Sequence, residues 1–160
     1  MIDNFCILIH YHEISLKGKN RSWFEQCLIK NIKCQLSGLP FSKVNLSAAR
    51  IFCFGIDQSI WNEYAQRLKK IMGIKHATLT DQIESNIELI QESASKQLKD
   101  VKFGTFRVST KRQYKEFPLS SQQMNEEVGK HIQSLYLKPV DLKNAELDMI
   151  IELVKGMAYV

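Results

Sequence analysis

The alternation of apolar and polar positions in the first half of the chain predicts the order strand, helix, strand, strand, helix, strand. An apolar run over residues 5–11 predicts the first strand. From residue 21 to about residue 36, apolar side chains recur every four positions, which predicts a helix that Asn20 caps and Gly38 ends. The remaining segments of this half are a hairpin over 44–46 and 50–54, a helix capped by Ser59 with Trp61, Tyr64, Ala65, Leu68 and Met72 on its apolar face, and a strand over 74–80. This order is that of a ferredoxin-like βαββαβ domain.

The second half repeats helical and strand-like periods in a different order. Ser85 and Glu88 have capping-box spacing before a helical stripe, and residues 105–110 alternate as a strand does. A second capping box, Ser120 with Gln123, opens a helix with Met124, Val128, Ile132 and Leu135 on one face, and strands follow over 148–154 and 157–160. We therefore predict an α+β chain: a ferredoxin-like domain over 1–80, a short hinge at 81–85, and an α/β domain over 81–160 that is truncated at its C-terminal strand.

Charge adds a functional hint to this pattern. The composition, 44% hydrophobic and 24% charged, is that of an ordinary soluble protein. Residues 1–76 carry eleven Lys and Arg against five Asp and Glu, whereas residues 77–160 carry eleven against twelve. Within the second half, residues 96–115 hold seven basic residues and one acid. Two concentrated basic segments favour nucleic-acid binding, although scattered solvated lysines would give a similar total.

Other chemistries find little support. No targeting or membrane-length segment is visible, so we expect a cytoplasmic protein. The four cysteines form no Cys-x-x-Cys pair, and we expect buried free thiols rather than a zinc or redox site. His10, His12 and Glu13 lack further ligands nearby in sequence, so we expect no metal. The aromatic residues Trp23, Phe24, Trp61 and Tyr64 fall at helical spacing and are expected to be core.

The most informative segment is YHEISLKGKNRSWFE, residues 11–25. It places Lys17, Lys19 and Arg21 around Gly18, directly after a predicted strand, and such a basic loop suits phosphate groups. The segment closely resembles the opening motif of the tRNA 4-thiouridine synthetases, also called tRNA sulfurtransferases. Among the positions compared, only His12 departs from that motif, which has glycine there.

The second domain resembles a THUMP domain, a tRNA-binding module, through the run FRVSTKRQYKEFPLSSQQMNEEVGKHI at residues 106–132 and the run at 140–153. Ala145 stands where the synthetases usually have proline. Lys111, Arg112 and Lys115 form the second predicted RNA-binding group. Tyr114 interrupts them and is our candidate for stacking on an unpaired base.

Together the two resemblances imply the substrate-recognition part of an enzyme that thiolates uridine 8 of tRNA, linked also to thiamine thiazole biosynthesis. The implied partner is tRNA, held by its acceptor stem and 3′ CCA end. The chain lacks the Ser-Gly-Gly-x-Asp-Ser pyrophosphatase loop and a persulfide cysteine, so we predict no catalytic residue and no cofactor in it. ATP, a sulfur donor and a homodimer contact would require a catalytic domain that follows. Two alternatives stay open: a stand-alone THUMP adaptor that presents tRNA to a separate modification enzyme, and a protein-interaction module without RNA.

Overall fold

The computed structural model describes residues 4–12 and 18–160, and it divides the chain into two compact units, Met1–Thr80 and Asp81–Val160. The elements of the first unit are β1 (Phe5–Tyr11), α1 (Arg21–Gln35), β2 (Lys43–Ser47), β3 (Arg50–Phe54), the 3₁₀ turn η2 (Gln58–Ile60), α2 (Trp61–Lys69) and β4 (Ile74–Glu84), whose last residues belong to the second unit. The strands lie in the order β2-β3-β1-β4, and both β1 and β2 pair antiparallel with β3. This is the predicted ferredoxin-like arrangement.

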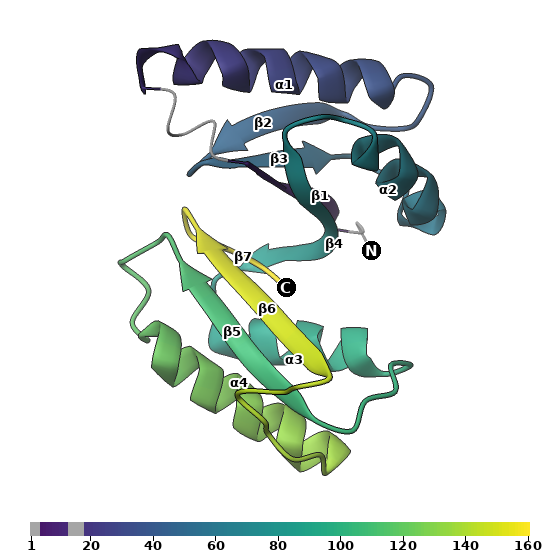
Figure 1. Ribbon diagram of the computed structural model, residues 1–160. Helices are drawn as coiled ribbons and strands as arrows, with labels where there is room; N and C mark the ends of the chain where they lie inside the picture. Colours follow the sequence, from purple (N-terminus) through teal and green to yellow (C-terminus); the bar gives the residue numbers. More distant parts are fainter. Residues whose placement is uncertain (1–3, 13–17) are drawn as a thin grey trace. The chain divides into compact units, whose positions relative to one another are not determined.

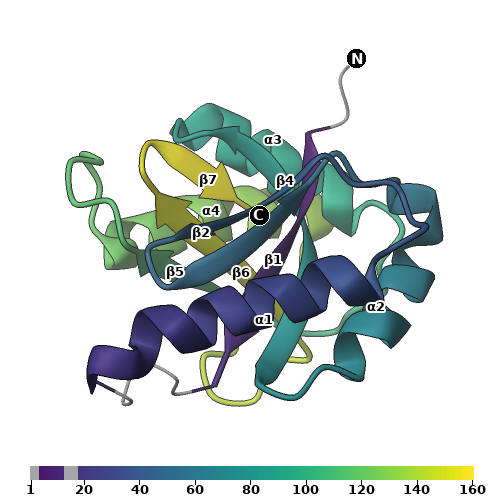
Figure 2. The same ribbon diagram turned by 90° about the horizontal axis from the view of Figure 1, so that it is seen from above.

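The core of the first unit lies between its sheet and two helices. Figures 1 and 2 show α1 and α2 on the same face of the sheet. Alternate β1 residues, Ile7 and Ile9, point to that face and pack against Ile32 of α1 and Tyr64 of α2, all with no exposed surface. Strand alternation and the helical period therefore converge on a single apolar layer.

Several local predictions in this unit are wrong. Asn20 makes no side-chain capping bond, because it ends a 3₁₀ turn that runs directly into α1. Asp57, not Ser59, caps the next helical segment by accepting the Ser59 N–H at 2.9 Å. Trp23 is 63% exposed and Met72 is 94% exposed, so neither belongs to the core. Helical spacing marks a face, but only packing decides how far along the helix that face is covered.

The second unit holds the end of β4 and the elements α3 (Ile87–Leu98), β5 (Phe106–Arg112), α4 (Ser121–Tyr136), β6 (Leu147–Val154) and β7 (Met157–Tyr159). Its strands lie in the order β4-β7-β6-β5, with β5 at the edge. The β5–β6 pair is parallel, as a strand–helix–strand crossover requires, whereas β7 is antiparallel to β6 and to β4. Residues 81–84, predicted to be a hinge, are part of β4.

Helices α3 and α4 cover one face of this sheet, as Figure 1 shows, and enclose the second core. The predicted capping box on Ser120 and Gln123 is confirmed. At α3, however, Asn86 is the cap, through its bond from the Leu89 N–H at 3.1 Å, and the Ser85 hydroxyl instead donates to the Gly156 carbonyl. Leu135 was predicted to lie on the buried face of α4 but is 56% exposed, although the helical period places it on the Met124–Val128–Ile132 stripe; it lies in the last turn of the helix, which ends at Tyr136.

The remaining expectations concern cysteines, metals and membranes. The four cysteines are free thiols, but the prediction that all are buried is wrong, since Cys34 is exposed and Cys27 is half-buried. Burial raises the pKa of the Cys53 thiol to about 12, with the neighbouring Cys6 acting in the same direction. Residues 4–12 and 18–160 contain no group of three or more potential metal ligands. Among those same residues, no helix has the length and apolar character needed to cross a membrane.

Candidate nucleic-acid interface

The first predicted basic group lies where β1 leads into α1. Lys19 is exposed in the 3₁₀ turn before α1, and Arg21 is the first residue of that helix. Gly18 has φ of +55°, a left-handed conformation that glycine adopts without the steric cost of a side chain. Lys17, the third predicted cation, lies outside the described residues. Two of the three predicted cations are therefore placed close together at the start of α1.

A buried carboxylate organises this end of α1. Glu25 is 6% exposed, and its Oε1 accepts both the Tyr11 hydroxyl and the Arg21 Nε–H at 2.7 Å. Burial acts to raise the pKa of Glu25, but the hydrogen bonds from Arg21 and Tyr11 outweigh it and leave that pKa below its usual value. The same contacts raise the pKa of Arg21. Glu25 therefore stays ionised and joins the end of β1 to the start of α1.

The structure reveals a candidate that sequence reasoning placed in the core. The indole of Trp23 is 63% exposed, two residues after Arg21, and meets Phe24 edge-on at 4.9 Å. An exposed tryptophan beside cations is suited to stacking on an unpaired base. The sequence does place Trp23 beside Arg21 in the basic segment, which could have indicated an RNA-binding role. Its helical spacing favoured a place in the core instead.

The second basic group is divided between the two faces of its sheet. Phe106 and Val108 point to the helices, so Arg112 lies on the same side and Lys111 on the opposite one. Lys111 is half-exposed, and its Nζ lies 3.6 Å from the Glu152 carboxylate, which is 1% exposed. Arg112 donates from Nη1 to the backbone oxygen of Leu119 at 2.9 Å and to that of Phe117 at 3.4 Å. Arg112 thus stabilises the loop between β5 and α4, a role that the sequence did not reveal.

Tyr114 and Lys115 differ in how available they are. Lys115 is exposed on the loop that follows β5. Tyr114 is half-buried and packs against the core of the second unit. Burial raises the pKa of Tyr114, and its hydrogen bond to Glu116 acts in the same direction. Lys115 is therefore the better-placed residue for a phosphate, and only part of the Tyr114 ring is open to a base.

A cavity of about 460 Å³ runs along α4 beside the edge strand β5. Its lining is mainly apolar, with amide and charged side chains from α4: Phe106, Val108, Gln122, Asn125, Glu126, Gly129, Lys130, Gln133, Val140 and Leu142. Gly129 has no packing reason to be glycine, because an added Cβ would meet only the Val108 Cγ2 atom, at 4.0 Å. The absence of a side chain at this position leaves room in the cavity. It also makes the helix less stable, by about 1 kcal/mol relative to alanine.

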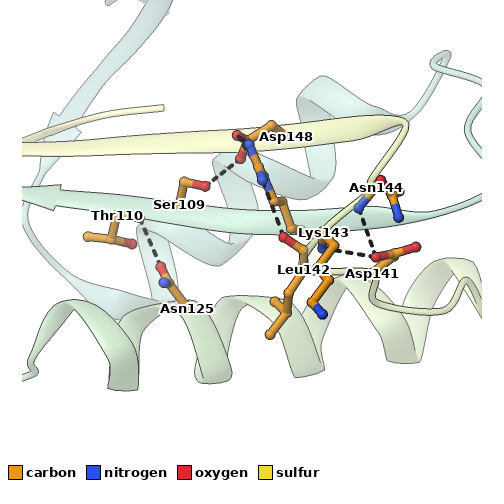
Figure 3. Close-up of polar contacts among 9 residues, drawn as sticks. Ser109, Thr110, Asn125, Asp141, Leu142, Lys143, Asn144 and Asp148 are labelled. Carbon is orange, nitrogen blue, oxygen red and sulfur yellow. Dashed lines mark hydrogen bonds and ion pairs between the residues drawn. The ribbon is translucent and has the colours of Figure 1, made fainter.

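Polar contacts fix the walls of this cavity. Figure 3 shows Asn125 reaching from α4 to β5, where its Oδ1 accepts the Thr110 N–H at 2.9 Å. Asp141 accepts the backbone N–H groups of Asn144 and Lys143, both at 2.9 Å, and these bonds lower its pKa. The loop next to Leu142 is therefore held in place. Thr110 directly precedes Lys111, but the Lys111 side chain lies on the face of the sheet opposite the cavity.

The opposite face of the same strand pair carries an ion pair. Arg107 donates through Nε and Nη2 to one oxygen of Asp148 at 2.9 and 2.7 Å, and the Ser109 hydroxyl donates to the other at 2.6 Å. The Asp148 hydrogen bond and charge raise the pKa of Arg107. Arg107 also reaches the Leu142 carbonyl at 3.3 Å. These bonds support the 141–144 loop from the sheet side and commit Arg107 to the fold.

Two family models match the chain and together cover nearly all of it. The ThiI ferredoxin-like domain matches residues 6–78, and the THUMP domain matches residues 82–160. The chain consists of a ThiI ferredoxin-like domain followed by a THUMP domain. A probable tRNA sulfurtransferase of Thermoanaerobacter pseudethanolicus is 38% identical over 160 residues, and one of Listeria monocytogenes is 32% identical over 154. These matches include 96% and 93% of this chain but 40% and 38% of the relatives, so the chain spans about two fifths of their length.

Solved structures agree with this assignment. PH1313 from Pyrococcus horikoshii superposes with a TM-score of 0.84 at 29% identity, over 97% of this chain and 53% of that protein. A 4-thiouridine synthetase in complex with RNA and ATP superposes with a TM-score of 0.79 at 27% identity, over 97% of this chain and 40% of that one. Both matches extend across the two units.

Proposed function

We propose that this chain binds tRNA through the acceptor stem and the single-stranded 3′ end, as the substrate-recognition part of an enzyme that thiolates uridine 8. The observation that carries the proposal is the likeness, over 97% of this chain, to a 4-thiouridine synthetase solved with RNA. The ATP and sulfur chemistry of such an enzyme would belong to the part of the relatives that this chain does not span.

Electrostatics supports a backbone-based mode of binding. An A-form stem has a deep, narrow major groove that side chains do not read, so recognition rests on phosphates, 2′-hydroxyls and unpaired bases. Lys19 and Lys115 are exposed, and Arg21 and Lys111 are partly exposed, although each of the latter two is also paired with a carboxylate. These side chains would neutralise phosphates, while Arg112 serves mainly to hold its loop.

The cavity along α4 supports binding of the unpaired 3′ end. Its volume of about 460 Å³ lies within the usual range of small-ligand pockets, roughly 300–1,000 Å³. Apolar walls from Val108 and Leu142 suit the face of a base, and amides such as Gln122 and Gln133 suit its polar edge. In this proposal an unpaired base enters beside Gly129, while Lys111, on the opposite face of the sheet, and Lys115, on the loop after β5, neutralise phosphates elsewhere on the RNA.

The proposal is tested by titrating a tRNA transcript with the chain at several salt concentrations. With five phosphate contacts from Lys17, Lys19, Arg21, Lys111 and Lys115, the logarithm of affinity should fall against the logarithm of salt with a slope of roughly −3.5 to −4.5. Removing the terminal CCA should weaken binding strongly. No measurable affinity would refute tRNA binding, affinity that does not depend on salt would refute the phosphate contacts, and affinity unaffected by trimming would refute the role of the 3′ end.

A further inference from the structure

The ion pair between Arg21 and Glu25 poses a problem for an RNA-binding surface. Glu25 places a negative charge beside a cation predicted to meet phosphate, and that charge should by itself weaken RNA binding. Burying a carboxylate also carries a desolvation cost, which a well-packed apolar side chain would avoid. Solubility therefore does not explain why a carboxylate occupies this 6%-exposed position, and its two hydrogen bonds must offset a desolvation cost that an apolar side chain would not have.

The geometry of the cluster supplies a reason. A single oxygen, Glu25 Oε1, receives the Tyr11 hydroxyl from the end of β1 and the Nε–H of Arg21 from the start of α1, each at 2.7 Å. The bond to Nε uses one of the five N–H donors of the guanidinium, and the side chain of Arg21 keeps 40% of its surface exposed. Glu25 thus fixes the plane of the guanidinium through its inner edge.

We propose that Glu25, supported by Tyr11, is a positioning residue that orients the Arg21 guanidinium for an RNA phosphate. A long, flexible arginine loses rotamer freedom when it binds, and holding it beforehand reduces that loss. Arginine recognises phosphate through paired N–H groups, and such recognition depends on the orientation of the guanidinium plane. The inference rests on the proposed tRNA binding. It predicts that Glu25 strengthens RNA binding, whereas its negative charge alone would weaken it.

This opposition of sign makes the inference testable. Glu25→Gln removes a negative charge, so electrostatics alone predicts tighter RNA binding and positioning predicts weaker binding. Glu63→Gln is a matched control, because Glu63 pairs with Arg67 at the same four-residue spacing and the same 2.7 Å on an exposed stretch of α2. Both variants change the net charge equally. Tyr11→Phe removes the hydroxyl bond with no change in charge, and it serves if Glu25→Gln fails to fold.

The experiment titrates an unmodified tRNA transcript with the 160-residue chain and each variant across a salt series. Losing one phosphate contact should flatten the logarithmic slope by about 0.7–0.9, which corresponds to roughly fivefold to eightfold weaker binding at 0.1 M salt. We expect that loss for Glu25→Gln, a smaller loss for Tyr11→Phe, and affinity at or above that of the parent for Glu63→Gln. Binding by Glu25→Gln as tight as the parent's, or tighter, overturns the inference.

Two further comparisons separate positioning from other causes. In an Arg21→Gln background, Glu25→Gln should not weaken binding further, because the side chain that Glu25 positions has gone and only the loss of its negative charge remains. A purely structural role would still weaken binding in that background, and such a result overturns the inference. A parent chain without measurable tRNA affinity would instead refute the proposed function itself.

Discussion

Replacing Arg112 should damage the loop that joins β5 to α4 as well as alter surface charge. Its guanidinium donates to the carbonyl of Leu119 at 2.9 Å, and the bond to Phe117 at 3.4 Å is too long to add much. A hydrogen bond from a charged group contributes about 1.5–3 kcal/mol, and competition from water brings the contribution of a half-buried side chain to the lower end of that range or slightly below it. We therefore expect Arg112→Ala to lower the stability of the second unit by about 1–1.5 kcal/mol.

The assay is thermal unfolding followed by circular dichroism, together with the salt dependence of tRNA binding. For a unit of this size a loss of 1–1.5 kcal/mol corresponds to a fall in Tm of about 4–12 °C. Arg112→Lys keeps the positive charge but loses the planar guanidinium. It should therefore lose much of the roughly 1–1.5 kcal/mol that Arg112 contributes, while the salt slope of tRNA binding stays unchanged. Lys115→Ala, on an exposed residue, should do the opposite: an unchanged Tm and a slope flatter by about 0.7–0.9.

This reasoning would be refuted if Arg112→Ala unfolded at the parent's temperature. It would also be refuted if Arg112→Lys flattened the slope as far as Lys115→Ala does. The first result would mean that Arg112 does not hold its loop, and the second would mean that its side chain contacts RNA phosphate.

Three more outcomes follow from the structure. Gly129→Ala should stabilise α4 by about 1 kcal/mol, because alanine favours the helix and the added Cβ meets only Val108. Gly129→Leu should fill the cavity, so its tRNA binding should no longer respond to removal of the CCA end. If Gly129→Leu responds to that removal as strongly as the parent does, the cavity does not bind the 3′ end. A thiol reagent at neutral pH should label the exposed Cys34 in the folded chain and spare Cys53, whose pKa is raised to about 12, until the chain unfolds; mass spectrometry distinguishes the two sites. The pKa of Glu25 is lower in the folded state than in the unfolded state, so its ionised form stabilises the fold above the unfolded-state pKa, and this stabilisation is lost as pH falls through the folded-state pKa. Glu25→Gln should therefore make the stability of the first unit less sensitive to acid. Parallel curves of stability against pH for parent and variant would contradict this.

The sequence alone determined the order of elements and most of the core. Ile7 and Ile9 alternate on a strand, and Met124, Val128 and Ile132 recur along a helix, so their burial follows from periods of two and 3.6 residues that any reader of the chain can recognise. The Ser120–Gln123 capping box was equally readable, because both partners lie within four residues. The two basic segments were also visible, since each is contiguous in sequence.

Tertiary structure decided which residues in those segments are free to act. Arg112 donates to the Leu119 carbonyl farther along its loop, Tyr114 packs against the core of the second unit, and Trp23 is exposed outside the core of the first. The stacking of His10 on His76, with ring centroids 4.3 Å apart, likewise joins two strands that the sequence separates. The cavity beside Gly129 also depends on segments that meet only after folding. Periodicity records how a residue faces its own helix or strand, whereas availability to a ligand depends on neighbours from distant segments, and those neighbours leave no periodic trace in the chain.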